Sequence, residues 1–294
     1  MGIETVAVTG ANGKIGRAIL TELNDHGYTT VNLARGKRRE DISDHYFTTN
    51  LIDAGEVYGS LSRSGADAII HMGTIPTPLR HPGYVTFESN IMSTWHVLEA
   101  VAALELDSAC IASSINAMGC AFQEEATEID YLPIDEDHRL TPRDPYAISK
   151  HALEVVGDGF GRMDALPKTI ASLRYPWVAT EDELRERYGT SDRSIETVDP
   201  NGSERDHLFS YLHLKDAASI ARKSIEADFT GHEVFWAVAG DTTVNAPTAD
   251  VVEKAYPEIE QRREFTGRES LISIEKAQKL LDWEPAHSWT DTSS

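Results

Sequence analysis

The residues best suited to chemistry are Tyr146 and Lys150, four positions apart in the stretch Tyr146-Ala147-Ile148-Ser149-Lys150. On a helix, side chains at this spacing share one face, so the phenol and the ammonium would point the same way. A free phenol titrates near pH ~10, and an ammonium fixed beside it favours the phenolate and lowers that pKa. The pair is a candidate proton donor and acceptor near neutral pH. An incidental pair on an exposed helix is the alternative that these residues alone leave open.

A glycine-rich turn follows the first expected strand, residues 4–9. Gly10 allows a tight turn, and Gly13 lets a pyrophosphate approach the backbone at the positive end of a helix. Gly16 lets that helix, whose apolar periodicity runs through residues 17–23, pack on the sheet. The order of strand, glycine loop and helix predicts a dinucleotide-binding turn, with the spacing GxxGxxG rather than GxGxxG.

A basic cluster follows the second expected strand, residues 29–33. NAD-selective folds often place a carboxylate at the end of this strand, where the chain has Ala34. Arg35 comes next, with further basic residues at 37–39. A 2′-phosphate on the ribose would explain such a cluster, so we expect NADP in preference to NAD. A solvated basic loop is the alternative, and the missing carboxylate does not exclude NAD.

Two further strands are predicted at residues 47–53 and 66–73. Asn50 or Asp53 could meet the adenine edge, or either could cap the helix expected near residue 54. Gly73 would leave room beside a cofactor, whereas His71 is interpreted as a packed strand-end residue rather than a catalyst. The three prolines within 74–82 predict a loop.

A long helix is predicted to open at residues 87–90 and to continue to about residue 101. Asn90 is a possible polar group of the active site or a helix-start residue. The next strand, residues 109–114, ends in Ser113 and Ser114. Strands that alternate with helices in this way predict an α/β fold with a Rossmann-like, doubly wound parallel sheet. Ligands bind beyond the carboxyl ends of such strands, so these two serines rank above other serines.

The composition limits the partners. The chain has 294 residues and a net charge of −21, with acidic residues spread along its length, so nucleic acid and anionic membranes are poor partners. The first residues enter a strand pattern without the features of a signal peptide, and no apolar run is long enough to span a bilayer, so we expect a cytoplasmic protein. Cys110 and Cys120 support neither a disulfide framework nor a zinc site, and no metal is expected.

With the glycine turn, the strand-end serines and the Tyr-Lys pair in one order, the chain resembles the extended short-chain dehydrogenase/reductase family, in its NAD(P)-dependent epimerase/dehydratase group. The resemblance covers nearly the whole chain. The segments that carry it are Thr9–Gly16 (the family's TGxxGxxG), Ser113–Gly119 (a serine-rich strand end), Thr141–Lys150 (a proline-marked approach to YxxxK), Leu173–Pro176, Tyr211–Ala218 (HVxD) and Ala277–Pro285 (LGWxP).

This resemblance implies site residues. Tyr146 would be the general acid/base, Lys150 would hold the nicotinamide ribose and lower the tyrosine pKa, and Ser114 rather than Ser113 would hydrogen-bond the reacting oxygen. Family members often pair through two long helices, here residues 90–103 and 144–160, so we expect a homodimer. The implied cofactor contacts are Gly10, Asn12, Gly13, Lys14, Ile15, Gly16, Arg35, Asn50, Leu51, Met72, Gly73, Asn90 and Lys150.

The resemblance weakens after about residue 175. Nucleotide-sugar epimerases commonly have a diphosphate-binding arginine where this chain has Phe209, although Arg205 could substitute. Arg174 is interpreted as structural, and the charged stretch 179–187 as a solvated helix face. We expect a dinucleotide-binding domain over residues 1–174 and a mainly substrate-binding subdomain over 175–294, which returns to the sheet near 208–240. A small, acidic substrate region favours a sugar, sugar acid or sugar phosphate.

Three functions stay open at this point. The first is a dehydrogenase or reductase that acts on a sugar-like hydroxyl, and the second is a nucleotide-sugar epimerase or dehydratase. The third is an NAD(P)-sensing regulatory protein without turnover, which is disfavoured because such proteins tend to lose the tyrosine or lysine. Uronate-type dehydrogenases resemble the chain in compactness and in the Ser-Ser-x-x-x-x-Gly strand end.

The acidic surface predicts adaptation to high salt, where counterions screen self-repulsion; an ordinary acidic cytosolic protein is the alternative. Arginines outnumber lysines two to one in this chain. We expect the melting temperature to fall as NaCl is removed, because the carboxylates then repel one another. Thermal melts at a series of NaCl concentrations test this, and a melting temperature that does not depend on salt would contradict it.

Overall fold

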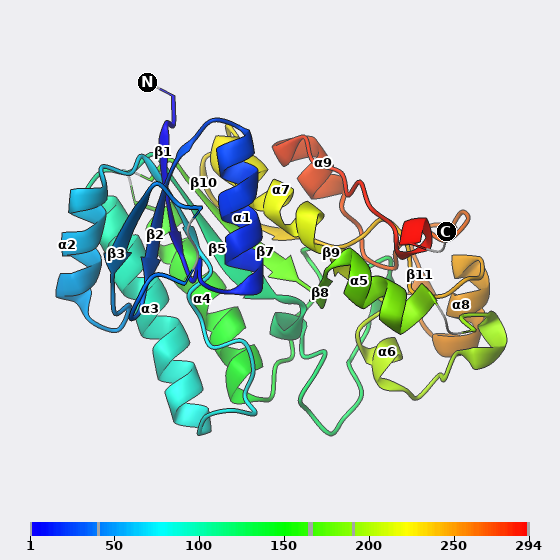
Figure 1. Ribbon diagram of the computed structural model, residues 1–294. Coiled ribbons are helices and arrows are strands. Elements are labelled where there is room, and N and C mark those ends of the chain that lie inside the picture. Colours follow the sequence, from blue (N-terminus) through cyan, green and yellow to red (C-terminus); the bar gives the residue numbers. More distant parts are fainter. Residues whose placement is uncertain (1, 40–41, 164–166, 190–191, 293–294) are drawn as a thin grey trace.

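The computed structural model describes residues 2–39, 42–163, 167–189 and 192–292. Its centre is a seven-stranded sheet in the order β10-β7-β5-β4-β1-β2-β3, in which every pair of neighbours is parallel (Figure 1). This confirms the predicted Rossmann-like fold. The strands are β1 (Thr5–Thr9), β2 (Thr29–Ala34), β3 (His45–Thr48), β4 (Ala68–His71), β5 (Ser108–Ser114), β7 (Thr169–Tyr175) and β10 (Gly231–Trp236).

Helices cover both faces of the sheet (Figure 1). Successive side chains of a strand point to opposite faces, so Val6 and Val8 join the apolar core on one face and Ala7 joins the core on the other. One face carries α1 (Lys14–Asp25), α7 (Leu214–Glu226) and α9 (Glu275–Leu281). The other carries α2 (Ala54–Ser64), α3 (Gly83–Ala103) and α4 (Pro145–Gly161). None of the described helices is both long and apolar enough to cross a membrane.

The start of α3 differs from our prediction. The helix begins at Gly83, several residues before 87–90, and Pro82 accepts hydrogen bonds from the N–H groups of Val85 and Thr86 at 2.9 and 3.2 Å. A Cβ atom on Gly83 would lie 2.7 Å from Cγ of Pro145, so the close approach of α3 and α4 requires glycine. A Pro-Gly pair suggests a turn in sequence, which concealed the true helix start.

A smaller lobe lies beyond the carboxyl ends of the central strands. Its own core includes Ile115, Leu132, Phe209, Trp236 and Val251, so it draws on the segment after β5 as well as on the C-terminal part of the chain. The chain rejoins the sheet through α7 and β10, and the division at residue 174 remains a prediction. The lobe contains β6 (Tyr131–Leu132), β8 (Val178–Ala179), α5 (Glu181–Leu184), α6 (Ser203–Asp206), β9 (Leu212–His213), α8 (Thr248–Ala255) and β11 (Glu260–Gln261), with short 3-10 helices at Ile115–Met118, Ile195–Thr197 and Trp289–Thr292.

Candidate active site

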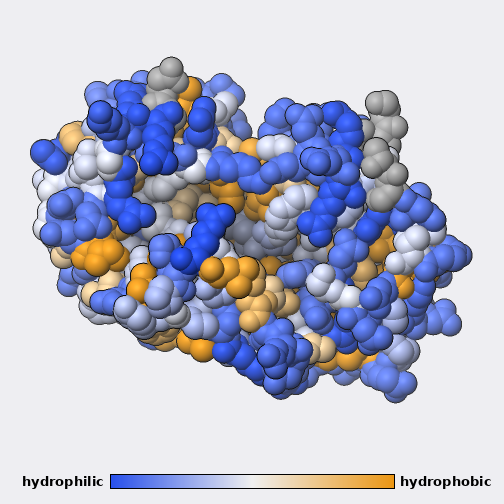
Figure 2. Space-filling model, turned by 60° about the horizontal axis from the view of Figure 1, so that its bottom comes forward, coloured by the Kyte–Doolittle hydropathy of each residue, from blue (hydrophilic) through white to orange (hydrophobic). Residues whose placement is uncertain are grey.

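A cavity of about 460 Å³ lies between the carboxyl ends of β4, β5 and β7 and the smaller lobe. Figure 2 shows the hollow, with apolar side chains exposed inside a largely hydrophilic surface. Thr74 and Pro76 line it from one loop, and Trp177 and His207 from the lobe. The loop within 74–82 and the chain after residue 175 therefore both contribute to one cavity, whose size suits a small ligand.

Helix α4 brings Tyr146 and Lys150 to the cavity wall. The Asp144 side chain caps the helix by accepting hydrogen bonds from the N–H groups of Tyr146 (2.9 Å) and Ala147 (3.0 Å), and Pro145 occupies the first turn. Both side chains line the cavity, as their spacing on one helix face predicted. The Lys150 ammonium nitrogen lies 5.6 Å from the centre of the Tyr146 ring.

Lys150 is fully enclosed by the protein. Its ammonium group donates to the Ala112 carbonyl at 2.5 Å and to the Thr74 hydroxyl at 3.0 Å. Burial lowers the pKa of Lys150 to about 7, and the Glu154 carboxylate, one turn further along α4, opposes this shift. The lysine therefore titrates close to neutral pH.

Our expectation that the lysine lowers the tyrosine pKa is wrong for this structure. Burial raises the pKa of Tyr146 to about 12, a hydrogen bond with Ser114 lowers it in part, and the Asp144 charge adds to the rise. Because the phenol is buried, its charged form loses hydration, and this cost outweighs the favourable neighbours. Lys150 directs its hydrogen bonds to Ala112 and Thr74 instead.

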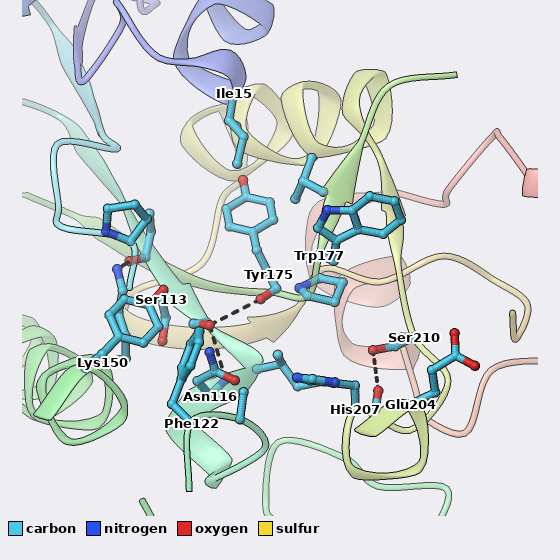
Figure 3. Close-up of a pocket in the computed structure, with 18 of the residues that line it drawn as sticks. Ile15, Ser113, Asn116, Phe122, Lys150, Tyr175, Trp177, Glu204, His207 and Ser210 are labelled. Atoms are coloured by element: carbon cyan, nitrogen blue, oxygen red, sulfur yellow. Dashed lines mark hydrogen bonds between the residues drawn. The ribbon is translucent and has the colours of Figure 1, made fainter. Parts of the chain in front are cut away.

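The two serines at the end of β5 differ in their partners. Ser113 donates to the Glu154 carboxylate at 2.5 Å, which ties it to a buried ion pair between Glu154 and Arg174 (2.8 Å). Arg174 does not line the cavity, in agreement with its interpretation as structural. The Ser114 hydroxyl accepts from the N–H of Asn116 at 3.2 Å and lies 3.5 Å from the Tyr175 carbonyl oxygen. Figure 3 shows Ser113, Asn116 and Tyr175 at the cavity wall.

Asn90 lies behind the cavity wall rather than at the start of a helix. It is fully buried within α3, and its amide accepts from the N–H of Ile75 (2.7 Å) and donates to the Ile75 carbonyl (3.1 Å). It also donates to the Ser149 hydroxyl at 3.0 Å. These bonds hold the loop after β4 against α3 and α4, and this loop supplies Thr74 to Lys150.

The glycine turn fits a dinucleotide. Gly10 has a φ of +67°, and a Cβ there would lie 2.9 Å from the Met72 carbonyl group, so the turn requires glycine. A Cβ on Gly16 would lie 2.5 Å from the Gly10 carbonyl oxygen, so this glycine permits close packing on the loop itself. Gly13 precedes α1, whose first turn has no acidic residue and no side-chain cap. The turn therefore leaves a positive helix end for a phosphate.

Other residues of the turn contact groups elsewhere in the protein. Lys14 forms an ion pair with Glu183 of α5 at 2.8 Å, which joins the turn to the smaller lobe. The Asn12 side-chain oxygen accepts from the Asn32 amide at 3.2 Å. Ile15 lines the cavity above Tyr175 (Figure 3).

The residues expected near the adenosine lie at the ends of β2, β3 and β4. Arg35 and Asn50 are exposed, and Asp53 caps α2 by accepting from the N–H of Glu56 at 3.0 Å. Gly73 is close to other groups, because a Cβ there would lie 2.3 Å from a Leu51 methyl group. The glycine therefore lets Leu51 pack here, and the room that we expect it to leave beside a cofactor stays a prediction. Met72 lines the cavity.

His71 is a packed residue, as predicted. Burial lowers its pKa to about 3, and its ring nitrogens lie 2.8 Å from the Thr9 hydroxyl and 3.3 Å from the Thr94 hydroxyl. Cys110 and Cys120 are both buried and form no disulfide.

Several cavity residues from the smaller lobe were not identified from the sequence. Arg187 is the last residue of the stretch that we interpreted as a solvated helix face, and Tyr188 follows it; Glu204 belongs to α6, and His207 follows that helix. Arg205, which we considered as a phosphate ligand, lies over the Tyr256 ring and does not line the cavity. These residues have no fixed spacing from the motifs, so only the folded lobe brings them to the site.

A group of possible metal ligands, His213, Asp216 and His287, lies outside the cavity lining. The two imidazole rings stack at 4.3 Å with an angle of 19° between their planes. An imidazole binds a metal through a nitrogen lone pair that lies in the plane of its ring. Because these two rings are nearly parallel and stacked, their lone pairs do not point toward one common ion. Asp216 instead binds Nδ1 (2.8 Å) and the backbone N–H (3.0 Å) of His287, so the group anchors the C-terminal segment.

Comparison with known proteins shows that the chain is similar to NAD-dependent enzymes that act on sugars and nucleotide sugars. The sequence model of the NAD dependent epimerase/dehydratase family matches residues 6–179. An L-arabinose 1-dehydrogenase (NAD(P)(+)) of Haloferax volcanii is 28% identical over 190 residues, which cover 62% of this chain and 70% of that protein. A UDP-glucose 4-epimerase of Corynebacterium glutamicum is 23% identical over 317 residues, covering 96% and 91%. The crystal structure of a UDP-glucose 4-epimerase with UDP-glucose from Thermotoga maritima superposes with a TM-score of 0.71 at 18% identity, covering 98% and 96%.

The buried lysine predicts a pH dependence of stability. The folded-state pKa of Lys150, about 7, lies below the ordinary lysine value of 10.5, so the unfolded chain binds more protons between these values and stability rises with pH there. Lys150→Met removes this contribution. The difference in unfolding free energy, wild type minus variant, should rise by up to about 1.4 kcal/mol per pH unit from pH 7 to 10. Urea melts of both proteins test this, and a difference that is flat or falls with pH would contradict it.

Proposed function

Because the chain belongs to the NAD-dependent epimerase/dehydratase family, we propose that it is an NAD(P)-dependent oxidoreductase acting on a hydroxyl or carbonyl group of a sugar or sugar-acid substrate. The observation that carries this proposal is the convergence of Ser114, Tyr146 and Lys150 on one cavity, which the glycine turn approaches through Ile15. The similarity to an L-arabinose 1-dehydrogenase supports a sugar as the substrate.

Each of the three side chains has a distinct task in this proposal. Oxidation of a carbinol removes a hydride from carbon and a proton from oxygen. When bound, the nicotinamide accepts or returns the hydride. Tyr146 exchanges the proton with the substrate oxygen, and Ser114 holds that oxygen by a hydrogen bond. Lys150 supplies positive charge beside the phenol and donors for a ribose.

For the cofactor, we propose NADP or NAD, with a slight preference for NADP. The Gly10–Gly16 turn would hold the pyrophosphate. Strand β2 ends at Ala34 without a carboxylate to repel a 2′-phosphate, and the exposed Arg35 follows directly. An arginine can bind a phosphate through two parallel hydrogen bonds.

A nucleotide-sugar epimerase is the second candidate, and one observation favours it. The UDP-glucose 4-epimerase of Corynebacterium glutamicum aligns with 96% of this chain, which is more than the arabinose dehydrogenase covers. The two functions differ in the fate of the cofactor. A dehydrogenase releases reduced cofactor, which absorbs near 340 nm, whereas an epimerase returns the hydride to the sugar and leaves the absorbance unchanged.

We also propose a homodimer that pairs through α3 and α4. Met92, Trp95, Ile148 and Val155 are exposed by 37%, 42%, 40% and 52% on these two helices. Such side chains on adjacent helices favour burial against a second copy. A cytoplasmic location remains our proposal as well.

Replacement of the phenol tests the proposed proton carrier. Tyr146→Phe should lower kcat about 10²–10⁴-fold, the range typical of a lost general acid or base, while the Kd for cofactor stays close to that of the wild type. Steady-state kinetics with a panel of sugars and a cofactor titration by fluorescence measure the two quantities.

The matched control is Tyr175→Phe, because this tyrosine lines the same cavity but donates its hydrogen bond to the Ala217 carbonyl at 3.1 Å. We expect this variant to retain most of its kcat. Full activity in Tyr146→Phe would show that another group carries the proton.

A further inference from the structure

Arg187 lines the cavity from the smaller lobe. It belongs to a π-helical turn, Arg185–Gly189, which continues α5. Such turns add a residue to a helix and are frequent at functional sites. The turn brings Arg187 and Tyr188 into the cavity lining, whereas Arg185 on the same turn does not line it.

Aromatic rings fix the orientation of the Arg187 side chain. The central carbon of its guanidinium lies 4.7 Å from the centre of the Trp177 ring and 5.6 Å from that of Tyr188. Both rings also line the cavity. Arginine carries its N–H donors in the plane of the guanidinium and binds a carboxylate or phosphate through them, so contact with two rings leaves a group of this chemistry at the cavity wall.

The charges around the cavity favour an anion beside Arg187. Among the described residues that line the cavity, the basic side chains are Lys150, Arg187 and His207, and the carboxylate is Glu204. Glu204 forms an ion pair with Arg193 at 2.9 Å, which offsets its charge. Burial lowers the pKa of His207 and the Arg187 charge adds to this effect, while the hydrogen bond with the Ser203 carbonyl and the Asp206 and Glu204 charges oppose it.

Lys150 and Arg187 have different positions. Lys150 lies on one side of the cavity in Figure 3, and Glu204 and His207 lie on the other. The Arg187 charge lowers the pKa of His207, and the guanidinium lies over the Trp177 ring. Both contacts place Arg187 on the side of the cavity away from Lys150. Lys150 donates to Ala112 and Thr74 next to the proposed nicotinamide position, and Arg187 is a basic group on the side of the cavity where the far end of a substrate would lie.

We infer that Arg187 binds an anionic group of the substrate, a carboxylate or a phosphate, and thereby selects sugar acids or sugar phosphates over neutral sugars. This inference rests on the proposed function and narrows its substrate class. It also means that Arg187, which belongs to the charged stretch 179–187, takes part in the substrate site.

The test uses matched substrates. D-glucose, D-glucuronate and D-glucose 6-phosphate share a ring and differ at C6, and the corresponding D-galactose compounds form a second set; UDP-glucose is added as a nucleotide sugar. We expect the wild type to have its highest kcat/KM with an anionic member. The preferred member shows whether the anionic group is a carboxylate or a phosphate.

In Arg187→Ala, KM for the preferred anionic substrate should rise about tenfold to a hundredfold with little change in kcat. The kcat and KM for the neutral sugar should stay within about threefold of the wild-type values.

Two further variants distinguish recognition from folding. Arg185→Ala is the matched control, because Arg185 pairs with Glu181 and Asp182 on the surface, and it should keep the anionic preference. Arg187→Lys keeps the charge but loses the bidentate geometry, so its KM should lie between those of the wild type and Arg187→Ala. Melting temperatures of all variants show whether lost stacking on Trp177 affects stability.

A wild type that prefers the neutral sugars, or an Arg187→Ala variant that keeps the anionic preference, would overturn the inference. Absence of turnover with every compound would count against the proposed function instead. In that case, calorimetric binding of D-glucuronate and D-glucose 6-phosphate to the cofactor-loaded protein decides the inference. Binding that is lost in Arg187→Ala supports it, and equal binding by both proteins, or binding by neither, overturns it.

Discussion

The burial of a phenol beside an ammonium group is the interaction on which this site depends. Tyr146 and Lys150 are both enclosed, so each loses the hydration that would stabilise its charged form. Burial shifts the two pKa values in opposite directions, with the lysine near 7 and the tyrosine near 12. At neutral pH the phenol keeps its proton and the lysine is close to its midpoint. A positive charge that enters the cavity would favour the phenolate, so a bound oxidised cofactor would prepare the pair for proton transfer.

The surrounding fold keeps this costly arrangement in place. Glu154 lies one turn beyond Lys150 on α4 and helps to retain its proton, while Arg174 and Ser113 in turn hold Glu154. A buried ion pair of this kind is not expected to add much stability by itself, but removal of one partner would leave an uncompensated charge. From the other direction, Asn90 fixes the loop that supplies Thr74 to Lys150. The reacting groups are therefore positioned in part by side chains that do not line the cavity, namely Asn90, Glu154 and Arg174.

The sequence predicted the parts that depend on local pattern. Strand periodicity and the glycine turn predicted the sheet, and the spacing of Tyr146 and Lys150 predicted that both lie on one helix face. It could not predict the tyrosine pKa, because burial is a property of the folded chain and here it outweighs the neighbouring ammonium. The start of α3 was missed because Pro82-Gly83 suggests a turn. Arg187 was missed because a charged helix usually faces solvent, and only the π-helical turn brings it to the cavity.

The most direct test of this account is the ionisation of Tyr146, measured as the ultraviolet difference between wild type and Tyr146→Phe during a pH titration, without cofactor and with saturating NAD⁺ or NADP⁺. Without cofactor, the account predicts no tyrosinate signal from this residue below about pH 11, because burial raises its pKa. With oxidised cofactor, the signal should appear at least about one pH unit lower, because the nicotinamide carries a positive charge. A titration curve that is the same with and without cofactor would contradict the claim that this phenol and the coenzyme share one site.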